Sequence, residues 1–165
     1  MQPDSIRYRL VYDAVQAGYT DWWFPGIGVA FLAIALVSPH FRRKETRSLG
    51  PWANHLVAGF ALCWAVGAFW STYGGYRSMR SALRSDRFTA VEGRVRNFQP
   101  SDPGDHKNET WEVESGGRVY HYAYVRSSLT PGFRKTSVHG GPIREGLRVR
   151  IADVDGYIAR LEVAP

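Results

Sequence analysis

The 165-residue chain has a single cysteine, Cys63, which excludes an intrachain disulfide and a zinc site built from several cysteines. Charge is missing from two long stretches. No Asp, Glu, Lys or Arg occurs in residues 22–41 or 48–76, which are 20 and 29 residues long. A helix of about 20 apolar residues can cross the hydrocarbon layer of a membrane. The two stretches therefore predict two transmembrane spans, at about residues 22–40 and 52–74.

Aromatic residues stand at the ends of both stretches, as they do where helices meet a membrane interface. Trp22 and Trp23 begin the first stretch, Trp52 begins the second, and Trp70 and Tyr76 lie near its end. A water-soluble helical hairpin is the alternative, but neither stretch shows the polar face at a 3.6-residue period that such helices need. A cleavable signal peptide is disfavoured because the basic residues follow the first stretch and no small-residue cleavage site ends it.

Basic residues flank the spans on two sides. They are Arg42, Arg43, Lys44 and Arg47 in the connection, and Arg77, Arg80 and Arg84 after the second span. The dense group in the connection favours a cytoplasmic connection, with both termini and the C-terminal domain outside the cytoplasm. The second group argues for the opposite orientation. Both groups are candidates for contact with anionic lipid headgroups, and a solvated helical stalk is the alternative for residues 77–87. We expect an integral protein of the bacterial inner membrane.

Small residues recur every four positions along the second span. They are Gly59, Cys63, Gly67 and Ser71, here called the small-residue stripe. The spacing places them on one helix face, where small side chains let another helix approach closely. Two partners are open for this face. One is the first span, through Gly26, Ala30 and Ala33, and the other is a second copy of the chain in a homo-oligomer.

Beyond Phe88 the apolar period changes to two, which is typical of strands. Six short runs are separated by turn-forming residues; they cover residues 88–98, 109–114, 117–126, 132–138, 147–154 and 157–163. Six short strands suit a closed or half-closed small barrel of the OB or SH3 type.

The predicted fold is therefore an α+β membrane protein. It consists of an N-terminal tail (1–21), a transmembrane helical hairpin (22–76), a helical stalk (77–87) and a small antiparallel β-barrel-like domain (88–165).

Two motifs bracket the polar half, VEGRV at residues 91–95 and GGPIREGLRVRI at residues 140–151. The pattern over about residues 90–163 resembles families of bacterial membrane proteins of unknown function. In these families, transmembrane helices carry a small all-β domain that opens with V-E-G-x-V and closes with G-G-x-I-x-x-G-x-x-V-R-I. The resemblance implies a β-barrel-like module on a membrane anchor, and it brings no catalytic residues.

No residue pattern indicates catalysis or a metal site. The serines lack a G-x-S-x-G context, and the glycine-rich HGGPIREG lacks the Lys-Ser/Thr of a phosphate loop. The loop with Asp102, Asp105, His106 and Glu109 has no calcium or zinc spacing. We therefore predict no enzyme activity, no catalytic residue, no metal and no cofactor.

One predicted strand places aromatic and basic side chains on the same face. They are Arg118, Tyr120, Tyr122, Tyr124 and Arg126. Such a row can stack on the bases of single-stranded nucleic acid. Half-buried packing in a barrel is the alternative, and the interleaved acidic residues argue against nucleic acid. The row is the best candidate recognition surface in the sequence.

The favoured function is a non-enzymatic membrane protein that displays its β domain as a binding or assembly module. Its partner would be another membrane or envelope protein, an envelope polymer, the lipid bilayer or a second copy of the chain. One alternative is an accessory subunit of a membrane transport or envelope-biosynthesis complex. Others are a nucleic-acid- or anionic-lipid-binding domain, or an enzyme whose site the sequence does not reveal.

Overall fold

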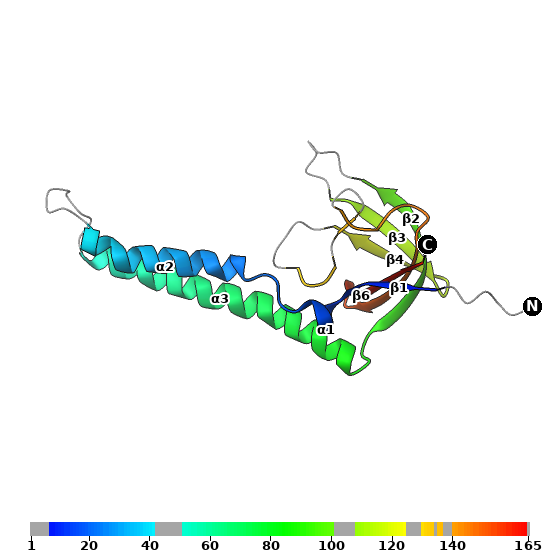
Figure 1. The fold of residues 1–165 in the computed structure, drawn as a ribbon, viewed down its shortest axis with the longest axis horizontal. Helices are drawn as coiled ribbons and strands as arrows, with labels where there is room; N and C mark the ends of the chain where they lie inside the picture. The colour runs from blue at the N-terminus through cyan, green and yellow to red at the C-terminus, as the bar shows by residue number, and fades with distance from the viewer. Residues whose placement is uncertain are drawn as a thin grey trace, which may run out of the picture. The chain divides into compact units, whose positions relative to one another are not determined.

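The computed structural model describes residues 7–41, 51–100, 108–124, 130–133, 135–136 and 140–164 (Figure 1). The helices are α1 (Ala14–Ala17), α2 (Trp23–Phe41) and α3 (Pro51–Arg84). The strands are β1 (Arg9–Asp13), β2 (Thr89–Gln99), β3 (Thr110–Ser115), β4 (Arg118–Ala123), β5 (Arg148–Val154) and β6 (Tyr157–Ala164). The chain divides into two compact units. Residues 19–74 form a helical unit, and residues 1–18 and 75–165 form a sheet unit.

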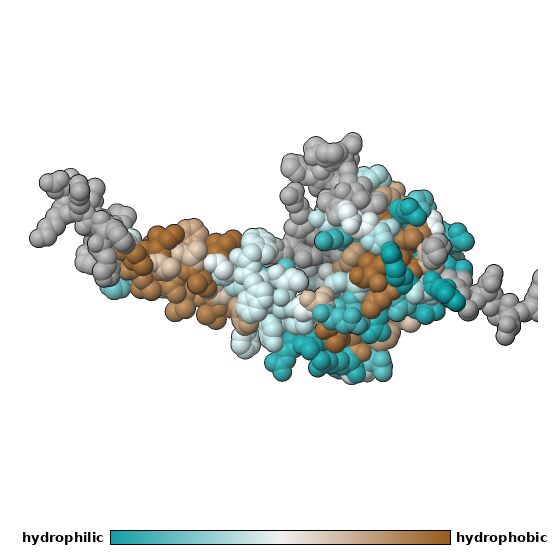
Figure 2. All heavy atoms as spheres, in the orientation of Figure 1, coloured by the Kyte–Doolittle hydropathy of each residue, from teal (hydrophilic) through white to brown (hydrophobic). Residues whose placement is uncertain are grey.

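The helical unit consists of α2 and the first part of α3. By length and composition, α3 is long and apolar enough to cross a membrane, and α2 contains a shorter apolar helix. Large apolar side chains cover the outside of both helices, and Figure 2 shows much of this unit in brown, the colour of hydrophobic residues. They include Trp23, Phe31, Ile34, Leu36, Trp52, Leu56, Phe60, Val66 and Trp70. This outward apolar surface is the reverse of what a helix pair in water presents.

The two helices contact each other through small side chains. Gly28 and Ala35 of α2 are buried, as are Ala61, Ala65 and Ala68 of α3. The two helices approach closely at Gly28, because a Cβ atom added there would lie 2.8 Å from the Ala65 backbone nitrogen. Small residues at the crossing allow the helix backbones to approach, which is how helices pack in membranes.

An aromatic cluster joins the beginning of the helical unit to α3. The Tyr19 ring lies edge-on to Trp22 at 4.9 Å and to Tyr73 at 5.7 Å between ring centroids. Its hydroxyl hydrogen-bonds the buried hydroxyl of Thr72, which also donates to the Ala68 carbonyl at 2.7 Å. Aromatic rings with a polar end are typical of residues at a membrane interface.

The sheet unit contains six antiparallel strands in the order β1-β6-β5-β2-β3-β4. The predicted α+β class is confirmed, but the predicted barrel is wrong. β1 and β4 are the two edges and do not pair with each other, so the sheet is open. An open sheet must cover its apolar face with other parts of the chain, because it does not close on itself.

The composition of the sheet also differs from the prediction at two places. The segment treated as an N-terminal tail supplies β1, which pairs with β6 from Arg9–Val163 to Asp13–Arg160. The predicted strand at residues 132–138 is not a strand in its described part, where Thr136 makes only an isolated bridge to Ile143. Runs 88–98, 109–114, 117–126, 147–154 and 157–163 are confirmed as strands, with small differences at their ends.

The core lies on one face of the sheet. Its buried residues are Val91, Val95, Trp111, Val113, Tyr122, Ile143, Val149, Ile151, Ile158, Leu161 and Val163. Phe133, Ile143 and Leu147 pack against this core from the segment before β5. That segment covers the apolar face, which explains why the sheet does not need to close into a barrel.

The last turns of α3 belong to a second apolar cluster in the sheet unit. Met79 and Leu83 are buried with Ala14, Ala152 and Ala159. Met79 and Leu83 therefore lie on the buried side of α3.

Candidate functional site

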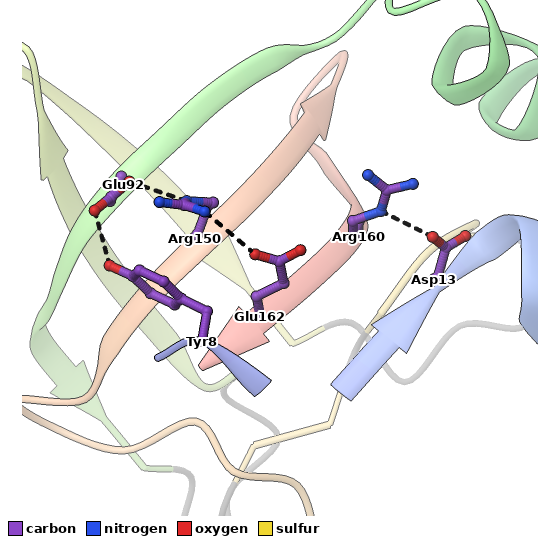
Figure 3. Close-up of polar contacts among 6 residues, drawn as sticks. All are labelled: Tyr8, Asp13, Glu92, Arg150, Arg160 and Glu162. Atoms are coloured by element: carbon purple, nitrogen blue, oxygen red, sulfur yellow. Dashed lines mark hydrogen bonds and ion pairs between the residues drawn. The ribbon is translucent and has the colours of Figure 1, made fainter. Parts of the chain in front are cut away.

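The outer face of the sheet carries a row of paired charges, drawn in Figure 3. Arg150 of β5 lies opposite Glu92 of β2 and Glu162 of β6 in the strand register. Its Nε atom donates to Glu92 Oε2 at 3.0 Å, and its Nη1 atom lies 3.7 Å from Glu162 Oε2. The Tyr8 hydroxyl donates to Glu92 Oε1 at 2.8 Å, and its ring lies 4.3 Å below the guanidinium of Arg150. We call these four residues the paired row.

The contacts in the paired row fix its protonation states. The hydrogen bonds from Tyr8 and then Arg150 lower the pKa of Glu92 below its ordinary value. Burial, followed by the hydrogen bond to Glu92, raises the pKa of Tyr8. The hydrogen bond to Glu92 raises the pKa of Arg150. Each of these three shifts moves the pKa of the group further from neutral pH, which favours a fixed negative charge on Glu92 and a fixed positive charge on Arg150.

A second ion pair on the outer face joins β1 to β6. Arg160 Nε donates to Asp13 Oδ2 at 2.8 Å, while Asp13 Oδ1 accepts from the Val15 backbone N–H at 2.7 Å. Asp13 is buried and is the N-cap of α1. The carboxylate therefore anchors the N-terminal segment to the sheet through a backbone and a side-chain contact.

Arginines line a pocket at the end of β5, beside the paired row. Arg94, Arg144 and Arg148 line a cavity of about 300 Å³ together with Glu145, Gly146, Leu147 and Ala164. We call it the arginine pocket. An adjoining cavity of about 580 Å³ shares Arg144, Leu147 and Ala164 and adds Arg9. None of these four arginines was among the predicted site residues. The run at residues 147–154 predicts a strand, but nothing in it predicts a pocket.

The tyrosine row of β4 is divided between core and edge. Tyr122 is buried, stacks on Trp111 at 6.0 Å and donates to Asp153 Oδ2 at 2.9 Å. Burial and the negative charge of Asp153 raise the pKa of Tyr122. Tyr120 and Tyr124 are partly buried against the same core. Arg118 is exposed, and Arg126 lies outside the described residues. Half-buried packing, the alternative left open by the sequence, is what the structure shows for the tyrosines.

The small-residue stripe does not face α2. Cys63 and Ser71 are exposed, and a Cβ atom added at Gly59 or Gly67 would meet nothing within 4 Å. The proposed partners on the first span do not face α3 either, since Ala30 and Ala33 are exposed and Gly26 has open space. Packing of the two spans through these residues is therefore wrong. The helices use the adjacent face of α3, at Ala61, Ala65 and Ala68.

The basic candidates for lipid headgroups fall into two sets. Arg42, Arg43, Lys44 and Arg47 lie outside the described residues. Arg77 and Arg84 are exposed on α3, whereas Arg80 is half-buried with its Nη1 3.5 Å from the Tyr76 hydroxyl. Arg80 is thus partly engaged within the sheet unit, and Arg77 and Arg84 are the ones that face solvent.

Of the four residues named in the acidic loop, the structure describes Glu109. Asp102, Asp105 and His106 lie outside the described residues, while Glu109 is buried and accepts a hydrogen bond from Thr136. Within the described ranges no three His, Cys, Asp or Glu side chains gather where they could hold a metal ion. Glu109 therefore has a structural contact that ties the 130–136 segment to β3.

No protein family, no curated protein and no solved structure matches the chain. The resemblance to bacterial membrane-protein families over residues 90–163 stays a prediction. The features of this chain that bear on its function are the apolar hairpin, the charged outer face and the arginine pocket.

Proposed function

We propose that this chain is a non-enzymatic integral membrane protein whose two helices anchor a sheet domain that acts as a binding or assembly module. The apolar exterior of the helical unit carries the proposal. Only 22% of the most apolar window of α3 is buried, whereas a core helix of a soluble protein is mostly buried. Apolar surface of this extent is covered by lipid in a membrane protein.

The binding half of the proposal rests on the outer face of the sheet. The core lies on the other face and is covered by the chain's own segment at Phe133 and Ile143. Ala152 on the charged face packs with Met79 and Leu83 of α3, whereas Glu92, Arg94 and Arg150 on the same face are exposed. Its paired row and arginine pocket present a fixed pattern of charge, which suits recognition better than proton transfer.

The orientation that the charge pattern favours places the sheet domain outside the cytoplasm of a bacterial inner membrane. It is supported by the four basic residues close to both helix ends in the connection between α2 and α3. The exposed Arg77 and Arg84 at the end of α3 are the opposing influence.

Two experiments test the anchor and its orientation. The full chain should stay in the membrane pellet after extraction with carbonate at high pH, and release into the supernatant would refute the anchor. In intact cells, with Cys63→Ala as background, a Val119→Cys variant should react with a membrane-impermeant thiol reagent, and Thr46→Cys should not. Val119 suits this role because it is 51% exposed on the edge strand β4. Labelling of Thr46→Cys alone would place the domain in the cytoplasm.

An accessory subunit of a membrane complex is the second candidate. The outward position of the small-residue stripe favours it, since a second helix could approach α3 closely at Gly59 and Gly67. A Gly67→Leu variant distinguishes the two functions. Under the subunit function it should release the chain from its complex in mild detergent, while under the module function it should leave the complex unchanged.

A further inference from the structure

Two arginines lie directly opposite each other on the outer face of the sheet. Arg94 of β2 pairs in register with Arg148 of β5, and Ala164 of β6 completes the row. Like charges at such positions destabilise an antiparallel pair, because their Cβ atoms are only about 4.5–5.5 Å apart. In the neighbouring paired row, opposite charges face each other, with Glu92 and Glu162 on either side of Arg150 (Figure 3).

The carboxylates near these arginines already have partners. Glu92 accepts from Arg150 and Tyr8 in the paired row. Glu114 accepts from Arg96 at 2.6 Å, and Glu145 accepts from the backbone N–H of Phe98 at 2.8 Å. Among the described residues, no carboxylate forms an ion pair with Arg94, Arg144 or Arg148. The lining of the arginine pocket therefore holds three arginines without an ion pair to a described carboxylate, against the one carboxylate of Glu145.

The backbone holds the arginine pocket in place. Residues 144–147 form a tight turn in which the Leu147 N–H donates to the Arg144 carbonyl at 3.2 Å. Gly146 occupies the third position with a φ of 75°, which glycine adopts without strain. Gly146 N–H also donates to Val95 carbonyl, and Val95 N–H donates to the Leu147 carbonyl, both at 2.9 Å. The turn is thus tied to β2, and it places Arg144 in the lining of the same cavity as Arg148.

We infer that the arginine pocket binds a phosphate group, carried by a soluble phosphorylated compound or by a phospholipid headgroup. A phosphate offers up to two negative charges and several acceptor oxygens, so it can engage more than one guanidinium fork at once. A single carboxylate would neutralise only one of the three arginines. A long nucleic-acid strand fits less well, because Glu92, Glu114 and Glu162 lie on the same face. The inference gives a ligand class to the module proposed above and rests on that proposal.

The test uses the full chain in a non-ionic detergent, titrated with inorganic phosphate at constant ionic strength by calorimetry. Binding should be saturable, and Arg94→Gln or Arg148→Gln should each weaken it about tenfold, since each removes a charge-assisted bidentate contact. Arg96→Gln is the matched control on β2, because Arg96 is already paired with Glu114. It should leave phosphate affinity unchanged.

A stability measurement separates a ligand role from a structural one. Without phosphate, Arg94→Gln should not lower the unfolding temperature, because it removes a like-charge contact. With phosphate, the unfolding temperature of the wild-type chain should rise, and that of the variant should not. A variant that unfolds at a lower temperature without phosphate would indicate that Arg94 stabilises the sheet, and it would overturn the inference.

Lipid nanodiscs distinguish the two sources of phosphate. With phosphatidylglycerol in the disc, a headgroup ligand should compete with inorganic phosphate and weaken its apparent binding to the wild-type chain compared with phosphatidylcholine discs, because the choline cation balances the headgroup phosphate of phosphatidylcholine. A soluble ligand should bind equally in both discs. If Arg96→Gln weakened phosphate binding as much as Arg94→Gln, the inference would be overturned. The inference would also be overturned if wild type and Arg94→Gln bound phosphate with the same affinity in detergent and in both kinds of disc. Carbonate extraction reports on the anchor separately, so the two proposals can fail independently.

Discussion

Replacing Gly28 with alanine should weaken the packing of α2 on α3. The added Cβ atom would lie 2.8 Å from Ala65 N, 2.8 Å from Trp64 Cδ1 and 2.9 Å from Ala65 Cα. Two of these are backbone atoms of α3, which cannot rotate away. Ordinary contacts between carbon atoms are about 3.5–4.0 Å, so the helices must separate by roughly 0.7 Å or more at this point.

The energetic cost follows from that separation. A gap of about 0.5–1 Å removes about a quarter to a half of the dispersion energy of each contact across the interface. Overpacking of a well-fitted interface costs about 1–3 kcal/mol. Alanine also gains about 1 kcal/mol of helix propensity over glycine. A Gly67→Ala control has the same gain in propensity without the clash, because its Cβ would meet nothing within 4 Å. The difference between the two variants therefore isolates helix contact, and we expect roughly 1–3 kcal/mol.

The assay is unfolding of the full chain in mixed micelles of a mild detergent and dodecyl sulfate, followed by helical circular dichroism. Gly28→Ala should unfold at a lower fraction of dodecyl sulfate than the wild-type chain, and Gly67→Ala at the same or a higher fraction. If Gly28→Ala and Gly67→Ala lose stability equally, α3 packs against α2 through the small-residue stripe. A Gly28→Ala variant as stable as Gly67→Ala would show that the helices do not meet at Gly28. Either result would refute the packing described above.

Three further variants test the sheet domain. Tyr122→Phe leaves a buried carboxylate oxygen of Asp153 without its hydrogen bond, so thermal unfolding should show a loss of about 1–3 kcal/mol. Gly93→Ala should lower the unfolding temperature strongly, since its Cβ would press on the β3 backbone and lie 2.9 Å from a Val113 methyl. Glu92→Gln should cost at most about 1 kcal/mol at pH 7, because the pair is solvent-screened. The lowered pKa of Glu92 makes its stabilisation present above the ordinary value of 4.5, and the difference from wild type should disappear as the pH falls through the lower folded value.

These three variants would contradict the structure in different ways. A neutral Tyr122→Phe would mean that the hydroxyl does not bond Asp153 in the folded chain. A Gly93→Ala variant of normal stability would mean that β2 and β3 are not in close contact there. A Glu92→Gln deficit that grows on acidification would require a raised pKa for Glu92, opposite to the effect of its hydrogen bonds from Tyr8 and Arg150.

Local patterns in the sequence were enough for α2, α3 and five of the six strands, but not for the short α1 in the segment predicted as a tail. Charge-free runs predicted the apolar helices because exclusion of charge is a property of the segment itself. Alternation predicted β2 and β5, and turn residues marked the hairpins. Gly116 and Gly117 have positive φ values, as do Asp155 and Gly156, which fits the two-residue turns that join β3 to β4 and β5 to β6.

The β1 strand and the helix interface could not be predicted in this way. β1 is only five residues long, and its place depends on pairing with β6 at the other end of the chain. The interface of α2 and α3 was misassigned because several faces of an apolar helix carry small residues. Which face is used depends on the rotation of each helix about its axis, which spacing alone does not determine.

In the candidate site too, the sequence determines some features and the tertiary structure determines others. The sequence determined that the polar half has a charged face, because arginine and glutamate alternate with valine and isoleucine in β2 and β5. It could not show that Arg150 lies opposite Glu92 while Arg94 lies opposite Arg148, because register between strands more than 50 residues apart is set by core packing and turn geometry. Only the tertiary structure decided which arginines are neutralised in the paired row and which remain in the arginine pocket, because charge pairing depends on distances between strands that no segment specifies by itself.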